Sequence, residues 1–274
     1  MTYDKQIEEI RACGMALLER GDVDVILGYT SNGDAMIPFF ARTPDDVNKL
    51  DWGHNCKQNL APYLANRADR VAIVAKPCDV RAIVQLIAEG QLSRSHVYII
   101  GVDCGGMKDI AGNPRPGCDE CRVHTPPIYD THIADGRVLQ TQANTESEKS
   151  SNTLSRFRQE IEKCILCYAC RQACYGCYCQ TCFAERTTPS WLPANIDSGT
   201  KMAFHLGRAM HLAGRCVECG GCEAACASDV KLRYIIKEIT AFVEETYDYQ
   251  AGMDIEATPP LTIYGADDKE IGFM

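Results

Sequence analysis

Cysteine is the residue type in this chain with the clearest capacity for chemistry. Seventeen of the 274 residues are cysteine, and seven of them lie in the stretch CILCYACRQACYGCYCQTC, between Cys164 and Cys182. Thiols stay reduced in the cytoplasm, so a dense cysteine pattern in a cytoplasmic protein is more typical of metal binding than of disulfides. One [4Fe–4S] cube takes four cysteine ligands, so this stretch holds more thiols than one cluster needs.

Two cysteine runs share the spacing C-x2-C-x2-C-x3-C, one starting at Cys164 and the other at Cys216. Two such runs in tandem are typical of a pair of [4Fe–4S] clusters, in which the fourth cysteine of each run ligates the other cluster. Zinc is the alternative, because four-cysteine zinc sites also use Cys-x2-Cys pairs, but three evenly spaced cysteines plus a fourth fit zinc poorly. We therefore expect one cluster at Cys164, Cys167, Cys170 and Cys226, and a second at Cys216, Cys219, Cys222 and Cys174.

The residue after the last cysteine of each run departs from the usual pattern. Proline is common there, whereas this chain has Tyr175 and Ala227. The thiolates ligate the cluster and the proline only shapes the turn. We therefore expect this departure to affect the local geometry and the reduction potential rather than ligation.

The clearest predicted elements form a strand–helix–strand unit. The apolar runs from Val71 to Ala75 and from Val97 to Val102 predict parallel strands, and residues 79–89 predict the covering helix. In such α/β sheets ligands collect where strands end and helices begin. Cys78 and Cys104 stand at those two strand ends, which makes them candidate ligands.

Several shorter elements precede this unit. Apolar spacing predicts a helix over residues 4–20, and residues 22–29 and 34–40 predict two strands joined at Asn32-Gly33. Thr43, followed by proline, is expected to cap a helical turn.

Cys78 also has a plain structural interpretation, since free cysteine is among the most buried residue types. The Cys118-x2-Cys121 pair in a turn-rich segment favours ligation instead, because such a turn is a common metal-binding element. Cys13 lies on the first predicted helix and is expected to be a packing residue.

We expect two domains joined by a linker. Residues 1–134 are predicted to form an α/β domain with a partly parallel sheet and covering helices. The polar segment 135–155 is the predicted linker, and residues 156–274 are predicted to form a mainly α-helical ferredoxin domain with two clusters. Helical spacing is expected around Phe157 and within GTKMAFHLGRAMHLAGR, and the acidic bias of residues 244–256 predicts a solvated tail.

Composition and charge exclude several classes of protein. The net charge of −9 disfavours nucleic-acid binding, which requires a basic face. No apolar run approaches the roughly 20 residues of a membrane span, and the acidic amphipathic start of the chain differs from a signal peptide. We therefore expect a cytoplasmic protein without a membrane span.

The motifs AKPCDVRAI, VYIIGVDCGG, CDEC and the two cysteine runs, in that order, resemble a known family. The chain is similar to the β subunits of deazaflavin-linked formate dehydrogenases and hydrogenases over residues 56–121 and 160–236. The resemblance implies electron transfer between a partner's active site, a flavin and [4Fe–4S] clusters. It also marks as candidate ligands eight cysteines outside the crossed sets: Cys56, Cys78, Cys104, Cys118, Cys121, Cys177, Cys179 and Cys182.

One departure from the family bears on the flavin. Between Cys121 and Cys164 the chain lacks the long middle stretch of full-length members, with its Gly-Asn-Trp-Gly-like segment, and no Gly-x-Gly-x2-Gly fingerprint follows a strand. We therefore expect a shortened β subunit with two [4Fe–4S] clusters and one or two further iron–sulfur clusters, and FAD as the open alternative. The N-terminal cysteines are expected to face the turn Cys177–Cys182 across the domain interface.

The functional prediction is an iron–sulfur electron-transfer subunit of a multisubunit oxidoreductase, with no catalytic residue of its own. Its expected partners are a catalytic formate dehydrogenase or hydrogenase subunit, or a heterodisulfide-reductase-like flavoprotein. The alternatives are a flavin- or deazaflavin-dependent subunit that performs hydride exchange itself, and a cluster-based redox sensor. Some basic side chains near the runs have two interpretations, as counter-charges or tuning groups for the clusters or as ordinary surface and packing residues; these are Arg171, Arg186, Arg208, Arg215, His205 and His211.

Overall fold

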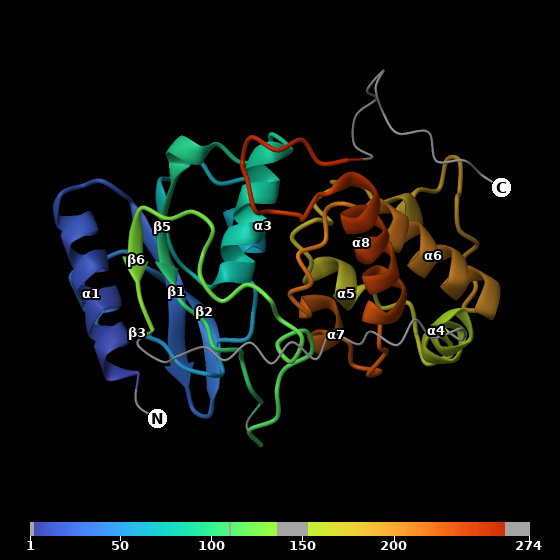
Figure 1. Cartoon of the computed structure of the whole chain (residues 1–274), viewed down its shortest axis with the longest axis horizontal. Coiled ribbons are helices and arrows are strands. Elements are labelled where there is room, and N and C mark those ends of the chain that lie inside the picture. Colours follow the sequence, from blue (N-terminus) through green and yellow to red (C-terminus); the bar gives the residue numbers. More distant parts are fainter. Residues whose placement is uncertain (1–2, 110, 136–152, 261–274) are drawn as a thin grey trace.

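The computed structural model describes residues 3–109, 111–135 and 153–260. It consists of a sheet-containing half and a helical half that lie side by side (Figure 1). The segment 136–152, which contains most of the predicted linker, lies outside the described residues. The last three residues of the predicted linker belong to helix α4 (Thr153–Glu162) instead, since its amphipathic pattern begins there and buries Phe157 and Ile161.

The first half contains a mixed sheet with the strand order β2-β1-β4-β5-β6, and β3 pairs with β1 outside this path. The pairs β1·β4, β4·β5 and β5·β6 are parallel, and β1·β2 and β1·β3 are antiparallel. The α/β prediction is therefore confirmed. The strands are β1 (Val25–Asn32), β2 (Ala35–Ala41), β3 (Leu50–Asp51), β4 (Val71–Ala75), β5 (Val97–Val102) and β6 (Thr131–Ile133).

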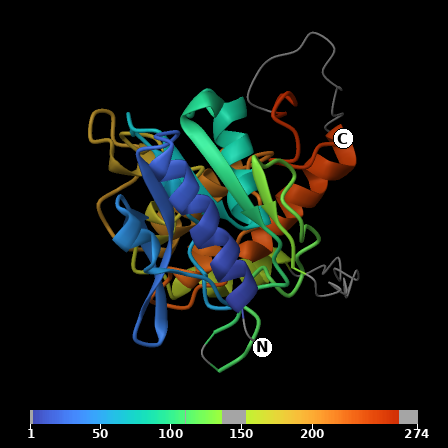
Figure 2. The same ribbon diagram turned by 90° about the vertical axis from the view of Figure 1, so that its left-hand side faces the viewer.

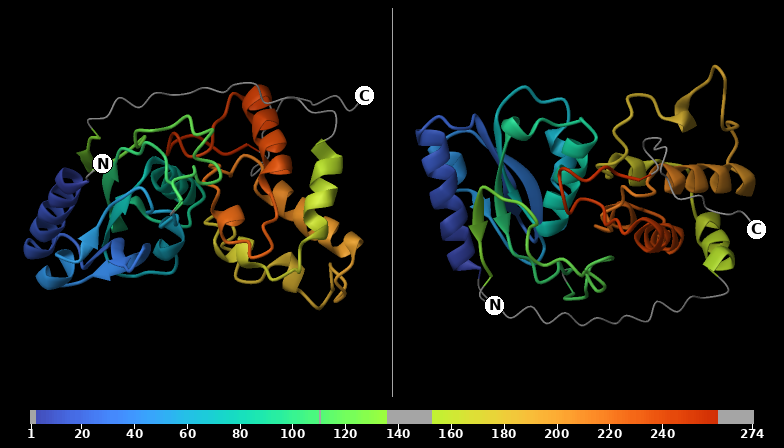
Figure 3. Two further views of the ribbon diagram at one scale, coloured as in Figure 1. Left: turned by 90° about the horizontal axis from the view of Figure 1, so that it is seen from below. Right: turned by 45° about the horizontal axis from the view of Figure 1, so that its top comes forward.

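Helices cover both faces of this sheet. Helix α1 (Asp4–Glu19) packs on one face and helix α3 (Pro77–Ala88) on the other (Figures 1 and 2). All five residues of β4 are buried, as expected for a central parallel strand between two layers. Figure 3 shows from two further sides that α3 lies between the sheet and the helical half. Shorter helices are α2 (Pro44–Val47), η1 (Ala61–Leu64) and η2 (Arg94–His96).

The predicted turns have the expected chemistry. Asn32 pairs with Ala35 across the hairpin, so Gly33 and Asp34 form the two-residue loop, and Gly33 has the positive φ of 60° that such a loop requires. The Thr43 hydroxyl accepts a hydrogen bond of 3.2 Å from the N–H of Asp46, which confirms its role as the N-cap of α2.

The second half is helical, and the structure describes no strand between residues 153 and 260. Besides α4 it contains two longer helices, α6 and α8, and shorter ones that follow the cysteine runs. Their bounds are α5 (Ala169–Gln172), η3 (Phe183–Glu185), α6 (Ser198–His211), α7 (Gly221–Ala224) and α8 (Arg233–Tyr247).

The segment after α8 does not form the solvated tail that its acidic composition suggests. It turns back from α8 and reaches α3 (Figure 1). The Arg81 Nε donates to the Ala251 carbonyl at 3.0 Å, and the Tyr249 hydroxyl contacts Gln85 at 3.0 Å. A Cβ on Gly252, where φ is 74°, would lie 2.1 Å from the Arg81 carbonyl oxygen. The prediction was wrong because a glycine and two hydrogen bonds dock this segment on α3.

No helix in the described ranges is both long enough and apolar enough to span a bilayer.

Candidate metal centres

The two cysteine runs have the same backbone conformation. In each run the residues just before and just after the second cysteine have positive φ angles: Leu166 (54°) and Tyr168 (60°) in the first, Glu218 (56°) and Gly220 (67°) in the second. Three of these four are not glycine, and such residues rarely adopt this region. The third cysteine of each run then lies on a one-turn helix, α5 or α7. The repeated spacing therefore corresponds to a repeated loop conformation.

Backbone N–H groups point at the first thiol of each run. The N–H of Leu166 donates to Cys164 Sγ at 3.3 Å, and the N–H of Glu218 donates to Cys216 Sγ at 3.4 Å. Hydrogen bonds to sulfur stabilise the thiolate form, which is the form that binds metal. The loops thus supply both the thiols and part of the environment that a bound cluster needs.

The structure groups the eight cysteines of these runs as the crossed assignment predicts. Cys226, from the second run, lines a cavity with the first three cysteines of the first run. Cys174, from the first run, lines a neighbouring cavity with the first three of the second run. Helices α5 and α7, which carry the third cysteines of the two runs, pack against each other. Ligation itself stays a prediction. The sets are Cys164, Cys167, Cys170 and Cys226, and Cys174, Cys216, Cys219 and Cys222.

The spread of these thiols differs from that of a single-ion site. Among the described residues, no group of three or more His, Cys, Asp or Glu side chains converges closely enough to hold one metal ion. A zinc site would place its thiolates about 2.3 Å from one ion. A cube instead distributes four thiolates over four iron atoms, and four cysteines line each cavity, which is the number that one cube takes.

Four N-terminal cysteines gather at a third cavity. Cys78, in the first turn of α3, and Cys104, just after β5, line it together with the Cys118/Cys121 pair. The N–H of Gly106 donates to Cys104 Sγ at 3.4 Å, as in the two runs. The carboxylate of Asp79 fixes the start of α3, since it accepts hydrogen bonds from the N–H groups of Lys76 (2.9 Å) and Leu60 (3.1 Å).

This third cavity adjoins the one at the second run, because Cys219 lines both. The loop that carries Cys118 lies backbone to backbone against the second run. A Cβ on Gly220 would lie 1.8 Å from the Pro116 carbonyl oxygen, and a Cβ on Gly117 would lie 2.6 Å from the Glu218 carbonyl oxygen. Glycine at both positions therefore allows the two cysteine loops to touch.

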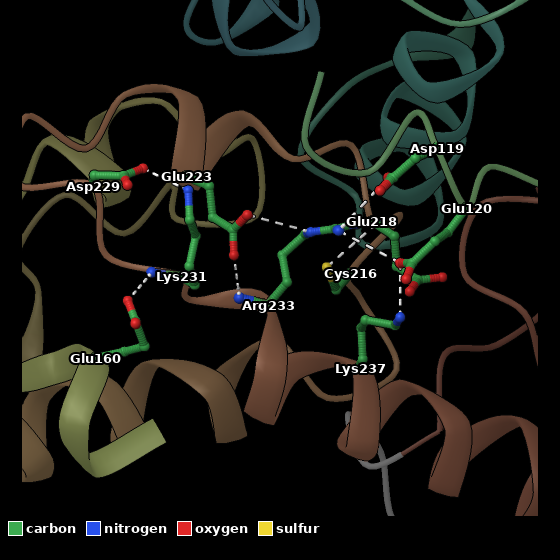
Figure 4. Close-up of polar contacts among 10 residues, drawn as sticks. All are labelled: Asp119, Glu120, Glu160, Cys216, Glu218, Glu223, Asp229, Lys231, Arg233 and Lys237. Atoms are coloured by element: carbon green, nitrogen blue, oxygen red, sulfur yellow. Dashed lines mark hydrogen bonds and ion pairs between the residues drawn. The ribbon is translucent and has the colours of Figure 1, made fainter. Parts of the chain in front are cut away.

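Charged side chains tie the same loop to α8 (Figure 4). The Arg233 guanidinium lies 3.4 Å from Glu223 on α7 and 3.4 Å from Glu120, which stands between the paired cysteines. Lys237, one turn further along α8, contacts Glu120 at 2.7 Å. Arg233 is largely buried, so these contacts hold the N-terminal loop and the second run in one arrangement.

The remaining candidate cysteines lie elsewhere. Cys56 is fully buried in the core of the first half; it lines none of these cavities, and burial raises the pKa of its thiol to about 12. Cys177, Cys179 and Cys182 line a separate cavity of about 640 Å³ next to Ala88, at the end of α3.

The N-terminal four therefore do not face this triplet, contrary to expectation. Cys78 stands at the first turn of α3 and Ala88 at its last residue. At a rise of ~1.5 Å per residue the two ends of this helix lie roughly 15 Å apart. The N-terminal set therefore lies at the start of helix α3, and the triplet lies near its end.

The basic side chains near the runs also differ in their surroundings. Arg186 is exposed, Arg171 is buried and paired with Glu185 at 2.5 Å, and Arg215 is paired with Glu89 at 2.5 Å. Arg208 is only 4% exposed, and its Nε has no hydrogen-bond partner. A buried cation without an anion is costly, so this site fits a negatively charged group, as thiolate-ligated clusters are.

An α/β half joined to a helical half with two cysteine runs is the arrangement expected of an iron–sulfur subunit of an oxidoreductase. Comparisons with known proteins point to the same class. Residues 68–186 match the family model for the C terminus of the coenzyme F420 hydrogenase/dehydrogenase beta subunit. The chain is 23% identical to the F420-dependent formate dehydrogenase subunit beta of Methanocaldococcus jannaschii, over 89% of this chain and 91% of that protein. It is also 23% identical to the F420-dependent formate dehydrogenase 1 subunit beta of Methanococcus maripaludis, over 94% of this chain and 95% of the relative.

These matches confirm the resemblance to the β-subunit family that the cysteine motifs indicate. The alignment with the M. jannaschii protein spans 353 positions, more than the 274 residues of this chain, so that relative carries stretches that are missing here. Among solved structures, a chain of the F420-reducing [NiFe] hydrogenase complex from Methanosarcina barkeri matches 40% of this chain and 44% of its own length, with 18% identity and a TM-score of 0.33.

Proposed function

We propose that the protein is the iron–sulfur electron-transfer subunit of a cytoplasmic oxidoreductase complex and holds three [4Fe–4S] clusters. The observation that carries the proposal is the grouping of twelve cysteines into three sets of four, each around its own cavity. Bound clusters of this kind carry single electrons between redox partners. The names of the relatives support a formate dehydrogenase or hydrogenase as the larger enzyme.

The arrangement of the cavities supports a relay through the chain. The set around Cys170 lies next to the set around Cys174, because the two runs cross. The second set then adjoins the N-terminal set through Cys219. At the first set Cys167 is exposed, and the neighbouring Ile165 is 57% exposed. We place the contact with a catalytic partner protein at this end, where a cluster would lie nearest to solvent.

The protein's own residues have definite roles in this proposal. The thiolates hold the clusters, and the backbone N–H groups at Leu166, Glu218 and Gly106 stabilise the sulfur ligands. The contact between the Cys118 loop and the second run keeps two sets at a fixed separation. Electron transfer requires such fixed positions rather than a substrate pocket, so no catalytic side chain is needed.

Iron and acid-labile sulfide analysis on anaerobically purified protein tests the proposal. Three clusters of four irons predict about 12 iron atoms per chain. The variant Cys219→Ser should lose iron, whereas the control Cys13→Ser, on α1 outside all three sets, should retain it. About eight iron atoms per chain would exclude the N-terminal cluster, and protein that reduces a soluble substrate with NADH by itself would contradict the role of a relay subunit.

A flavin- or deazaflavin-dependent function is the second candidate, and one observation favours it. The cavity of about 640 Å³ beside Cys177, Cys179 and Cys182 has the size of a small-molecule site and includes the aromatic side chains of Tyr178 and Phe183. Acid denaturation of the purified protein distinguishes the two functions. Release of a visible flavin into the supernatant would favour this candidate, and a supernatant without flavin absorbance would favour the relay.

A further inference from the structure

Arg208 occupies a central position among the cysteine sets. It lies on α6 and is 4% exposed. Its guanidinium Nη2 donates a hydrogen bond of 3.2 Å to the carbonyl oxygen of Cys170, a residue of the first set. Its side chain also lines the cavity of the second set and the large cavity beside Cys177. A single buried cation therefore lines the cavity of the second set and hydrogen-bonds the backbone of the first.

No carboxylate neutralises this charge within the described part of the chain. The ion pairs found there include Arg171 with Glu185 and Arg215 with Glu89, but none includes Arg208. Its Nε also lacks a hydrogen-bond partner. Burial lowers the pKa of the Arg208 guanidinium, and the neighbouring cysteines, with Cys174 and Cys222 foremost, raise it when they are ionised. The side chain thus has cysteine side chains, rather than acidic residues, as its electrostatic neighbours.

We propose that Arg208 is the shared counter-charge of the two crossed clusters and raises their reduction potentials. The inference rests on the proposed function, since it requires both clusters. A four-thiolate cube that accepts one electron gains one negative charge, and a buried cation beside it stabilises the reduced form. The effect is strong because protein, rather than water, surrounds Arg208. Arg208 is therefore a positioning and tuning residue, and it does not ligate iron.

Redox titration of the whole protein with dithionite, monitored by EPR, tests this role in the variants Arg208→Met and Arg208→Lys. In the Met variant the equilibrium constant for one-electron reduction of one or both clusters should fall at least tenfold. This corresponds to a reduction potential lower by ~59 mV. The Lys variant keeps the charge and should recover at least half of that shift. Arg171→Met is the matched control, because Arg171 is similarly buried but already paired with Glu185. It should shift the potentials less than Arg208→Met.

Iron content separates the possible results. Unchanged potentials in a fully loaded Arg208→Met protein, or an equal shift in the Lys variant, would overturn the inference and leave the relay function standing. If Arg208→Met fails to assemble clusters, Arg208→Gln provides a second neutral variant. If the Met and Gln variants both lose iron and the Lys variant retains it, the result would support Arg208 as a counter-charge. Loss of iron in the Met, Gln and Lys variants alike would overturn the inference. Wild-type protein without iron would refute the proposed function itself.

Discussion

The close contact at Gly220 predicts a large effect from adding one methyl group. Gly220 has a φ of 67°, and a Cβ there would lie 1.8 Å from the Pro116 carbonyl oxygen and 2.8 Å from its carbon. The left-handed conformation alone costs an alanine about 1–2 kcal/mol. The clash is with backbone, which has no rotamer to change, so overpacking adds about 1–3 kcal/mol. We therefore expect Gly220→Ala to lower the stability by about 2–5 kcal/mol in total.

Gly90→Ala is the matched control for this prediction. Gly90 has a φ of 65°, and a Cβ there would meet nothing within 4 Å. The substitution Gly90→Ala should therefore lower the stability only by the cost of the left-handed conformation, about 1–2 kcal/mol. Urea midpoints measured anaerobically by tryptophan fluorescence at a fixed incubation time compare the two variants, and iron analysis reports the clusters. Gly220→Ala should also lose iron, because the loop of Cys118 and Cys121 must move away from the second run. Equal midpoints and full iron content in both variants would refute the close contact.

Two further predictions concern the contacts that join the halves. Glu89→Gln removes the carboxylate that contacts Arg215 at 2.5 Å and should destabilise the protein by about 1–3 kcal/mol, whereas Glu9→Gln, at a solvent-exposed pair on α1, should change the urea midpoint little. Equal effects of these two substitutions would contradict the ion pair at Glu89. Tyr249→Phe removes the hydroxyl that contacts Gln85 at 3.0 Å and should cost about 1 kcal/mol. Faster proteolysis of the segment after α8 should accompany that loss, and an unchanged cleavage rate would show that the segment does not depend on this contact.

The sequence by itself determined the local elements and the composition of the crossed sets. Strand β4 and its neighbour β5 follow from continuous apolar runs, and the cap at Thr43 follows from side-chain chemistry within three residues. The spacing of the two cysteine runs likewise determined the loop that each run forms, and the known crossing of such paired runs indicated the composition of the two sets. The strands, the cap and the loops depend on contacts between near neighbours, which a sequence pattern records directly.

Only the tertiary structure decided how the remaining cysteines gather. The N-terminal four meet beside Cys219, and the triplet that begins at Cys177 lies at the other end of α3. The tertiary structure alone also decided that the segment at Ala251 docks on α3 and that Arg208 is buried without a carboxylate partner. Composition predicted a solvated tail and left the arginine ambiguous. Such features depend on which surfaces pack together across the chain, and that packing depends on shape and on glycines such as Gly220 rather than on local spacing.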